Sequence, residues 1–362
     1  MKKELLALLV SLLVIAIVVS AASALCSPKR HNYGSDWGEF LQEEENTIDV
    51  LFIGSSLTYC NIIPAIFWEE TGLTAGDVTG PELTVPGAYH YLVEALKTQS
   101  PKVVFIETSG ALYSRYTGFT KTVIGQMPWG LNRLEMTLRE GEPENRLGLL
   151  FPMFFYHSRW TELSGDDWAV FREGYQKDMN AGYTYLNQYR VPGGYVVRDD
   201  AGHDQENNAR NLEYLKKIAA LCLEQGITPV FYESPAASMM PRELMDPIFE
   251  ALGSIDGAVT VNFNDHREAI GAALEGGLLR CPPLQRRRCG EIQHLPGPVG
   301  PGESGRRAYR PGRRGPLAVP GGIHPRSPGA AHDSSIKREG LGPLFYISLP
   351  CWKICLYFVP DF

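Results

Sequence analysis

Hydrophobic and polar positions follow a regular order in two parts of the chain, residues 48–106 and 208–263. Four short apolar runs bounded by polar turns are typical of buried strands. They cover residues 48–53, 102–106, 227–232 and 258–263. Amphipathic stretches predict helices at residues 62–71, 88–99 and 208–225. Strands that alternate with helices predict an α/β fold, with a parallel sheet and helices on both of its faces.

The first 26 residues have a different pattern. An uncharged run from Leu5 to Cys26 follows Lys2 and Lys3, and it is long enough to cross a hydrocarbon core of about 30 Å. We expect an uncleaved signal anchor, a transmembrane helix whose N-terminus stays in the cytoplasm. A signal peptide cleaved after the Ala-Ser-Ala at residues 22–24 and a lipid attached to Cys26 remain open alternatives. In each case the rest of the chain functions outside the cytoplasm.

Charge and proline content divide the remaining chain. Residues 278–362 contain 13 of the 26 prolines, with 13 basic and 5 acidic residues, and therefore have a net charge of +8. Residues 1–277 have a net charge of −15, so that the whole chain has −7. We therefore expect a polar, acidic linker at 27–47, one α/β domain at 48–277 and an irregular tail at 278–362. Within the domain, residues 110–200 are rich in aromatic residues, and we expect them to form an irregular insertion over one end of the sheet.

The cysteines are sparse and have neither disulfide-framework nor zinc-site spacing. We expect no cofactor, no bound metal and no nucleic-acid partner.

A serine follows the first predicted strand. Ligands bind at the carboxyl ends of the strands of an open parallel sheet, and Ser56 lies just past such an end, after Gly54 and Ser55. Its hydroxyl could act as a nucleophile, with backbone N–H groups stabilising an oxyanion. Alternatively, Ser55 or Ser56 simply caps the helix that follows. The Gly-x-Ser-x-Gly elbow is not matched, because Thr58 occupies the second glycine position.

Residues 48–59, Pro86-Gly87 and residues 101–107 together resemble the SGNH/GDSL hydrolases, in particular membrane-anchored bacterial members related to lipoteichoic-acid D-alanylation proteins. The resemblance covers residues 45–275. It implies a three-layer, flavodoxin-like fold, Ser56 as the nucleophile, and an oxyanion site formed by Gly87 and the Ser56 N–H. Residues 107–111, Glu-Thr-Ser-Gly-Ala, depart from the family's Gly-x-Asn-Asp block, so the oxyanion asparagine has no clear counterpart.

The family's C-terminal Asp-x-x-His, which supplies the base and its orienting acid, is absent after residues 264–266. None of His157, His203 and His266 is expected to replace it. With codons chosen to suit at the degenerate positions, a back-translation of residues 277–298 read one base later gives DFYDARHFNAAGAEKFSTYLG, which contains Asp-x-x-His where the family expects it. We therefore expect that a frameshift has changed the encoded tail. A genuine basic tail that binds anionic polymers or lipid headgroups is the competing interpretation.

The resemblance thus implies an extracytoplasmic serine esterase or O-acyltransferase that acts on acylated cell-envelope glycans or other esters. It lacks its catalytic Asp and His, and we expect it to be inactive as written. The alternative is a membrane-anchored binding or scaffold protein of envelope assembly.

Overall fold

The computed structural model describes residues 2–31, 33–184, 196–197, 204–235, 238–266, 274–275 and 278–279. His203 and all of the predicted tail after residue 279 lie outside these ranges. The strands are β1 (Val50–Gly54), β2 (Ala75–Thr79), β3 (Val103–Glu107), β4 (Val196–Val197), β5 (Thr228–Glu233), β6 (Ser238–Met239), β7 (Val259–Asn262), β8 (Leu274–Glu275) and β9 (Leu278–Leu279).

The helices fall into two groups along the chain. Those up to residue 112 are α1 (Lys2–Cys26), α2 (Trp37–Phe40), α3 (Ser56–Tyr59), α4 (Pro64–Thr71), α5 (Val85–Ala95) and the 3₁₀ helix η1 (Ser109–Leu112). Those after it are α6 (Thr120–Gln126), α7 (Leu131–Glu140), η2 (Pro143–Asn145), α8 (Arg146–Leu150), α9 (Met153–Tyr156), η3 (His157–Thr161), α10 (Gly165–Glu173), α11 (Gln205–Glu224), α12 (Arg242–Gly253) and η4 (Phe263–His266).

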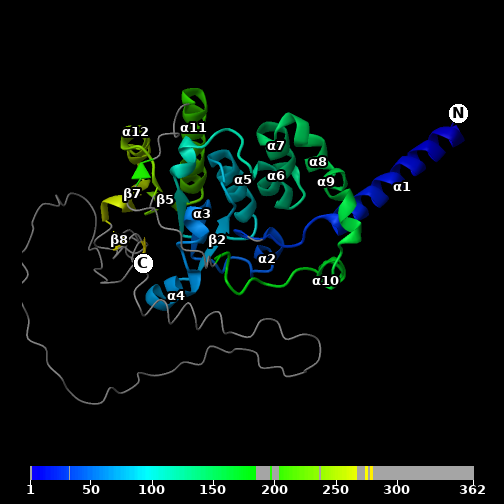
Figure 1. The fold of residues 1–362 in the computed structure, drawn as a ribbon, viewed down its shortest axis with the longest axis horizontal. Helices are drawn as coiled ribbons and strands as arrows, with labels where there is room; N and C mark the ends of the chain where they lie inside the picture. Colours follow the sequence, from blue (N-terminus) through cyan, green and yellow to red (C-terminus); the bar gives the residue numbers. More distant parts are fainter. Residues whose placement is uncertain are drawn as a thin grey trace, which may run out of the picture. The chain divides into compact units, whose positions relative to one another are not determined.

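Five strands form a parallel sheet in the order β2-β1-β3-β5-β7 (Figure 1). Numbered along the chain, this is the order 2-1-3-4-5 found in flavodoxin-like sheets. The four strands predicted from apolar runs are all present, and so are the predicted helices α4, α5 and α11. The α/β character of the domain is therefore confirmed.

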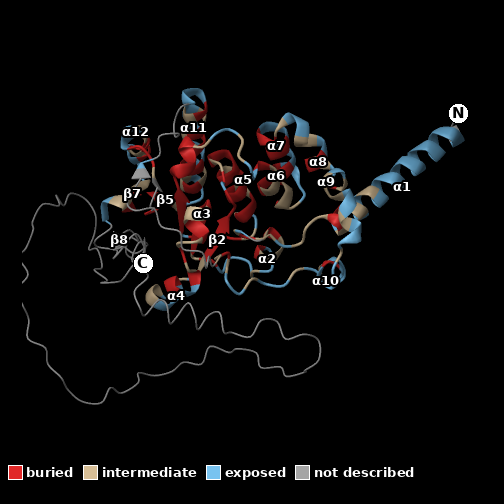
Figure 2. Ribbon diagram, viewed as in Figure 1, coloured by how far each residue is buried: buried red, intermediate tan, exposed pale blue. Residues whose placement is uncertain are grey.

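Successive residues of β1 pack into two separate hydrophobic clusters, one on each side of the sheet. Leu51 and Ile53 belong to the larger cluster, which includes side chains of α5, α11 and α12. Val50 and Phe52 belong to the smaller one, which includes Phe67 of α4. Because both faces are covered, the central strands are buried throughout (Figure 2).

Strand β2 has no counterpart among the predicted strands. Its residues, Ala-Gly-Asp-Val-Thr, include a glycine and a carboxylic acid, and both residue types are uncommon in strands. Asp77 is nevertheless only 1% exposed, and burial raises the pKa of its carboxyl well above the usual range. The tertiary context therefore overrides the local pattern at this strand.

The prediction of an irregular segment after residue 110 was wrong for residues 120–173. This stretch contains α6 to α10, which are 4 to 10 residues long. Helices this short leave little room for a recognisable period of 3.6 residues. The segment predicted as a linker also packs against the domain, since Trp37 and Phe40 are buried and Ser35 donates to the Asp77 carbonyl at 2.6 Å.

Helix α1 is long and apolar enough to cross a membrane, a property that signal sequences share. Its large apolar side chains from Leu5 to Val18 are exposed. In Figure 1, α1 (blue) meets the other described residues at its C-terminal end, beside α9 and α10.

Candidate functional site

The carboxyl ends of β1 and β3 approach each other closely. A Cβ added at Gly54 would lie 2.5 Å from Glu107 Cβ and even closer to Thr58 Oγ1. Only a glycine therefore fits where β1 turns into α3. The same close approach brings Ser55, directly after the strand, into contact with the end of β3.

Ser55 is the N-cap of α3 and is 1% exposed. Its Oγ accepts from the Leu57 N–H and donates to Glu107 Oε2, each at 3.4 Å, and it also lies 3.4 Å from the Tyr113 hydroxyl. Of the two serines after β1, Ser55 thus has the capping role that the sequence left open.

Ser56 is partly exposed and is the first residue of α3. The first N–H groups of a helix have no acceptor within it and carry partial positive charge. The nucleophile expected from the sequence is therefore accessible at the carboxyl edge of the sheet, beside the positive end of a short helix.

Three polar contacts hold α3 and the residues that follow it against the end of β5. Thr58 Oγ1 lies 2.9 Å from the Tyr232 hydroxyl, in a buried position. Asn61 Nδ2 donates to Ser234 Oγ at 2.9 Å, and Ser234 Oγ donates to the Leu57 carbonyl at 3.0 Å. These bonds fix the orientation of the helix that carries Ser56.

Two buried carboxyl groups lie at the ends of adjacent strands. Burial raises the pKa of Glu107 to about 7, and the charge of Glu233 adds to this effect, while the N–H of Ser109 donates to Glu107 Oε1 at 2.9 Å. Burial also raises the pKa of Glu233, which accepts from Asn262 Nδ2 at 2.6 Å. The sequence reasoning did not single out either carboxyl; the available signal is an acidic residue ending an otherwise apolar strand.

Gly87, the second expected oxyanion donor, lies in the first turn of α5. Its N–H donates to the N-cap hydroxyl of Thr84 at 3.4 Å. A Cβ at this position would lie 2.8 Å from Leu83 Cδ1 and 3.4 Å from Met136 Cε. The close packing of Leu83 and Met136 against this position accounts for the glycine. The oxyanion role of Gly87 stays a prediction.

Where the family's asparagine is expected, η1 begins with Ser109, whose N–H is already bonded to Glu107.

No hydrogen bond joins a histidine to Ser56 within the described ranges. His157 is exposed in η3, where its Nδ1 lies 3.3 Å from the Phe154 carbonyl. His266 is exposed in η4, after the last strand of the large sheet. His90 is buried in α5, with Nδ1 2.7 Å from Asn132 Oδ1. The base required by a serine nucleophile is thus not supplied by these three residues.

The described part of the chain contains no cluster of three or more His, Cys, Asp or Glu side chains that could hold a metal ion. Among the described residues, a surface cavity of about 300 Å³ is lined by residues that include Arg115 and Arg210, and another of about 10 Å³ by residues that include Thr84. Neither is lined by Ser56 or Gly87. Comparisons with protein-family models, curated proteins and solved structures found no significant match.

Proposed function

We propose that this chain carries the nucleophile of an extracytoplasmic SGNH-type serine esterase or O-acyltransferase, whose substrates are acyl groups of the cell envelope. The observation that carries the proposal is the position of Ser56, partly exposed on the first turn of α3 directly after the carboxyl end of β1. The finer fold assignment, a three-layer SGNH-type domain anchored by a single transmembrane helix, belongs to the same proposal.

In this reaction Ser56 Oγ attacks the carbonyl carbon of an ester, and a base takes the hydroxyl proton. The carbonyl oxygen becomes an oxyanion, for which the Ser56 N–H at the start of α3 and the Gly87 N–H are the proposed donors. The Gly87 N–H would exchange its 3.4 Å bond to Thr84 Oγ1 for one to the oxyanion. Collapse of the tetrahedral intermediate expels the alcohol, which receives the proton from the base. Water or an acceptor hydroxyl then removes the acyl group from Ser56.

The base is the missing component. Restoring the reading frame after residue 277 would supply an Asp-x-x-His after the last strand of the sheet, where the imidazole could take the Ser56 proton. We expect the chain as written to turn over esters no faster than its Ser56→Ala variant, because a serine hydroxyl without a base is a weak nucleophile.

A fluorophosphonate probe tests the proposal, because it reacts with activated serines. The frame-restored chain should be labelled and should hydrolyse a p-nitrophenyl ester. Its Ser56→Ala variant should do neither, whereas Ser158→Ala, a change in the distant helix η3, should retain both. Equal labelling of the parent and Ser56→Ala would refute the assignment of the nucleophile. Sequencing of the gene that finds an intact frame, together with detection of the tail by mass spectrometry, would refute the frameshift.

A scaffold protein of envelope assembly is the second candidate. One contact favours this candidate: the Ser109 N–H donates to Glu107. Ser109 lies where active members present an oxyanion asparagine, and its N–H is already bonded within the protein. A frame-restored chain that folds but is not labelled by the probe would support this candidate.

A further inference from the structure

The C-terminal turn of α1 is packed into the folded domain. Ser23 and Cys26 are 6% and 4% exposed, although the preceding turns of α1 are open. Ser23 Oγ accepts from the Met153 N–H, at the start of α9, at 3.1 Å. The last turn of α1 is therefore part of a tertiary contact.

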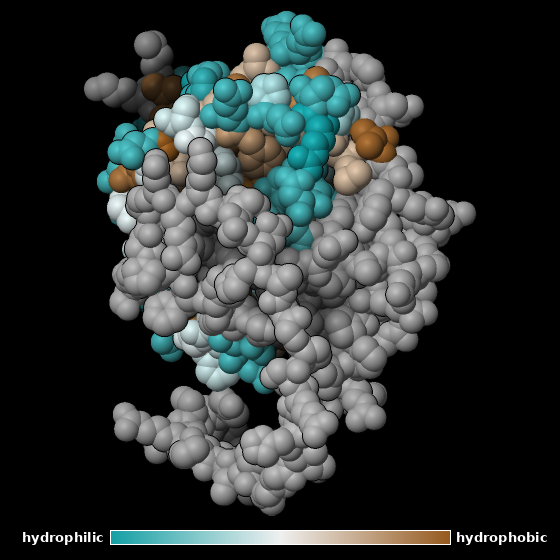
Figure 3. All heavy atoms as spheres, turned by 90° about the vertical axis from the view of Figure 1, so that its left-hand side faces the viewer, coloured by the Kyte–Doolittle hydropathy of each residue, from teal (hydrophilic) through white to brown (hydrophobic). Residues whose placement is uncertain are grey.

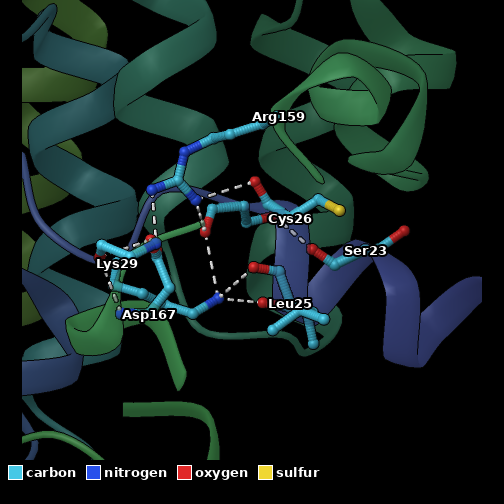
Figure 4. A network of polar contacts seen from close by, with 9 residues as sticks. Ser23, Leu25, Cys26, Lys29, Arg159 and Asp167 are labelled. Atoms are coloured by element: carbon cyan, nitrogen blue, oxygen red, sulfur yellow. Dashed lines mark hydrogen bonds and ion pairs between the residues drawn. The ribbon is translucent and has the colours of Figure 1, made fainter. Parts of the chain in front are cut away.

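Two cationic side chains bind the carbonyl groups at the end of α1 (Figure 4). Arg159 Nη1 donates to the carbonyls of Cys26 and Ser27 at 3.2 and 3.1 Å, and Lys29 Nζ donates to the Leu25 carbonyl at 3.2 Å. The last carbonyls of a helix lack intrahelical donors and carry partial negative charge. Arg159 is held in turn by Asp167 Oδ1 at 2.7 Å. Cleavage after residue 24 would remove part of this contact, so the geometry favours a retained helix.

The length of the open part of α1 places this contact near a membrane surface. From Leu5 to Ala22 a helix rises about 27 Å, at about 1.5 Å per residue. The hydrocarbon core of a bilayer is about 30 Å thick. If α1 spans the bilayer, the helices packed against its last turn lie at the depth of the lipid headgroups.

Those helices expose large apolar side chains. Helix α1 contacts α9, η3 and α10, and α9 follows α8 directly. The exposed set, which we call the collar, is Leu147, Phe151, Phe154, Trp160, Trp168 and Phe171. Aromatic side chains of this kind are enriched where a protein meets the membrane–water interface.

The segment that carries the collar has almost no net charge. Residues 146–173 contain three basic and four acidic side chains, so the segment has no excess of positive charge to attract anionic lipids. The described surface near α12 and β7 has a different character: it is mostly hydrophilic (Figure 3), and Arg242, Glu243 and Asp246 of α12 are exposed.

We propose that the collar lies in the headgroup–acyl boundary of the bilayer that α1 spans, and that it holds the domain in a fixed orientation on the membrane. The inference rests on the proposed membrane anchorage but not on the proposed esterase activity. The apolar collar supplies the contact with lipid, while the bonds from Arg159 and from the Met153 N–H to the end of α1 fix the distance between helix and collar.

Tryptophan quenching in nanodiscs tests the proposal. The full chain is reconstituted in zwitterionic phosphatidylcholine, with or without bromine near the top of the acyl chains. Trp160→Phe and Trp168→Phe each remove one collar fluorophore while keeping an aromatic ring. Trp68→Phe, on α4, is the matched control, because Trp68 is 52% exposed outside the collar.

We expect bromolipid to quench the parent chain and the Trp68→Phe variant strongly, and the double variant Trp160→Phe/Trp168→Phe to lose most of that quenching. The effect should persist at high salt, because the segment has almost no net charge. Equal quenching of the double variant and the parent would overturn the proposal. So would a mass of the membrane-bound chain that lacks residues 1–24. Neither the quenching nor the mass depends on esterase activity. A failure of this proposal can therefore be distinguished from a failure of the proposed function.

Discussion

The Ser55 hydroxyl lies 3.4 Å from Glu107 Oε2, and this contact links the carboxyl ends of β1 and β3. Both side chains are almost completely buried. The link leaves Ser56, the next residue, at the surface of the same turn. A structural serine and the proposed nucleophile are therefore adjacent in sequence but differ in burial and in partners.

The first prediction separates the two serines by stability. Ser55→Ala removes an N-cap and a partner of a buried carboxyl, and we expect it to lower the free energy of unfolding by about 1–2 kcal/mol. Ser56→Ala should change it by less than about 0.5 kcal/mol, as is usual for a partly exposed position without buried partners. Chemical denaturation of the full chain in detergent measures both. A larger loss for Ser56→Ala would reverse the assigned roles.

The second prediction concerns pH. Folding raises the pKa of Glu107 from 4.5 to about 7, so between these values the folded state holds a proton that the unfolded chain has released. Stability from this group is therefore fully present below pH 4.5 and is lost as the pH rises to 7. The loss amounts to about 3 kcal/mol at 1.36 kcal/mol per pKa unit.

Glu107→Gln should remove this dependence, because an amide is neutral throughout and can still accept from Ser109 and pair with Ser55. We expect the variant to match the parent at pH 4.5 and to be more stable at pH 8. Titrating groups that do not interact with Glu107 contribute equally to both chains and cancel in the difference between their urea unfolding curves. Glu233 does interact with Glu107, so the difference reports on this pair of carboxyl groups. Parallel profiles of unfolding free energy against pH for the two proteins would show that folding does not raise the pKa of Glu107.

The third prediction tests the close approach at the turn. Gly54→Ala would force the new Cβ against Thr58 Oγ1 and Glu107 Cβ, and we expect a loss of about 1–3 kcal/mol. Gly125→Ala is the control: a Cβ there has open space within α6, and alanine should stabilise the helix by about 0.5–1 kcal/mol. Thermal melts that rank the two variants in the opposite order would contradict this account.

The sequence predicts the central strands because they are continuously apolar, as strands buried on both faces must be. It does not predict β2, because Gly76 and Asp77 break the apolar pattern. Asp77 is buried, and its carbonyl accepts from Ser35, which is remote in sequence. Local sequence places Ser56 after a strand, but the role of Glu107 depends on its burial and on the charge of Glu233, which is remote in sequence.

The exposed aromatic residues of the collar also explain why the nearby helices were not predicted from the sequence. An apolar position usually predicts the buried face of a helix, whereas Phe154 and Trp160 are 60% and 67% exposed. Their pattern therefore does not follow the period of a helix that packs on a core, and the short helices α8 to α10 could not be recognised from it.

The last prediction concerns the end of α1. Arg159→Met keeps a flexible, unbranched side chain, although a shorter one, and removes the donors to the Cys26 and Ser27 carbonyls. The N–H of Ser27, bonded to the Ser23 carbonyl at 3.0 Å, should then exchange with deuterium about tenfold faster or more, since hydrogen bonds to charged groups contribute about 1.5–3 kcal/mol. Hydrogen–deuterium exchange on the full chain in detergent measures this rate.

Arg172→Met is the matched control for this experiment. Arg172 is an exposed residue of α10 whose Nε donates to the carbonyl of Trp168 in the same helix, at 3.3 Å. Its loss leaves the end of α1 untouched, so exchange at Ser27 should remain at the parental rate. If both variants exchange alike, the arginine at 159 does not hold α1. The distance between α1 and the collar would then have to be set by the packing of Ser23 and Cys26.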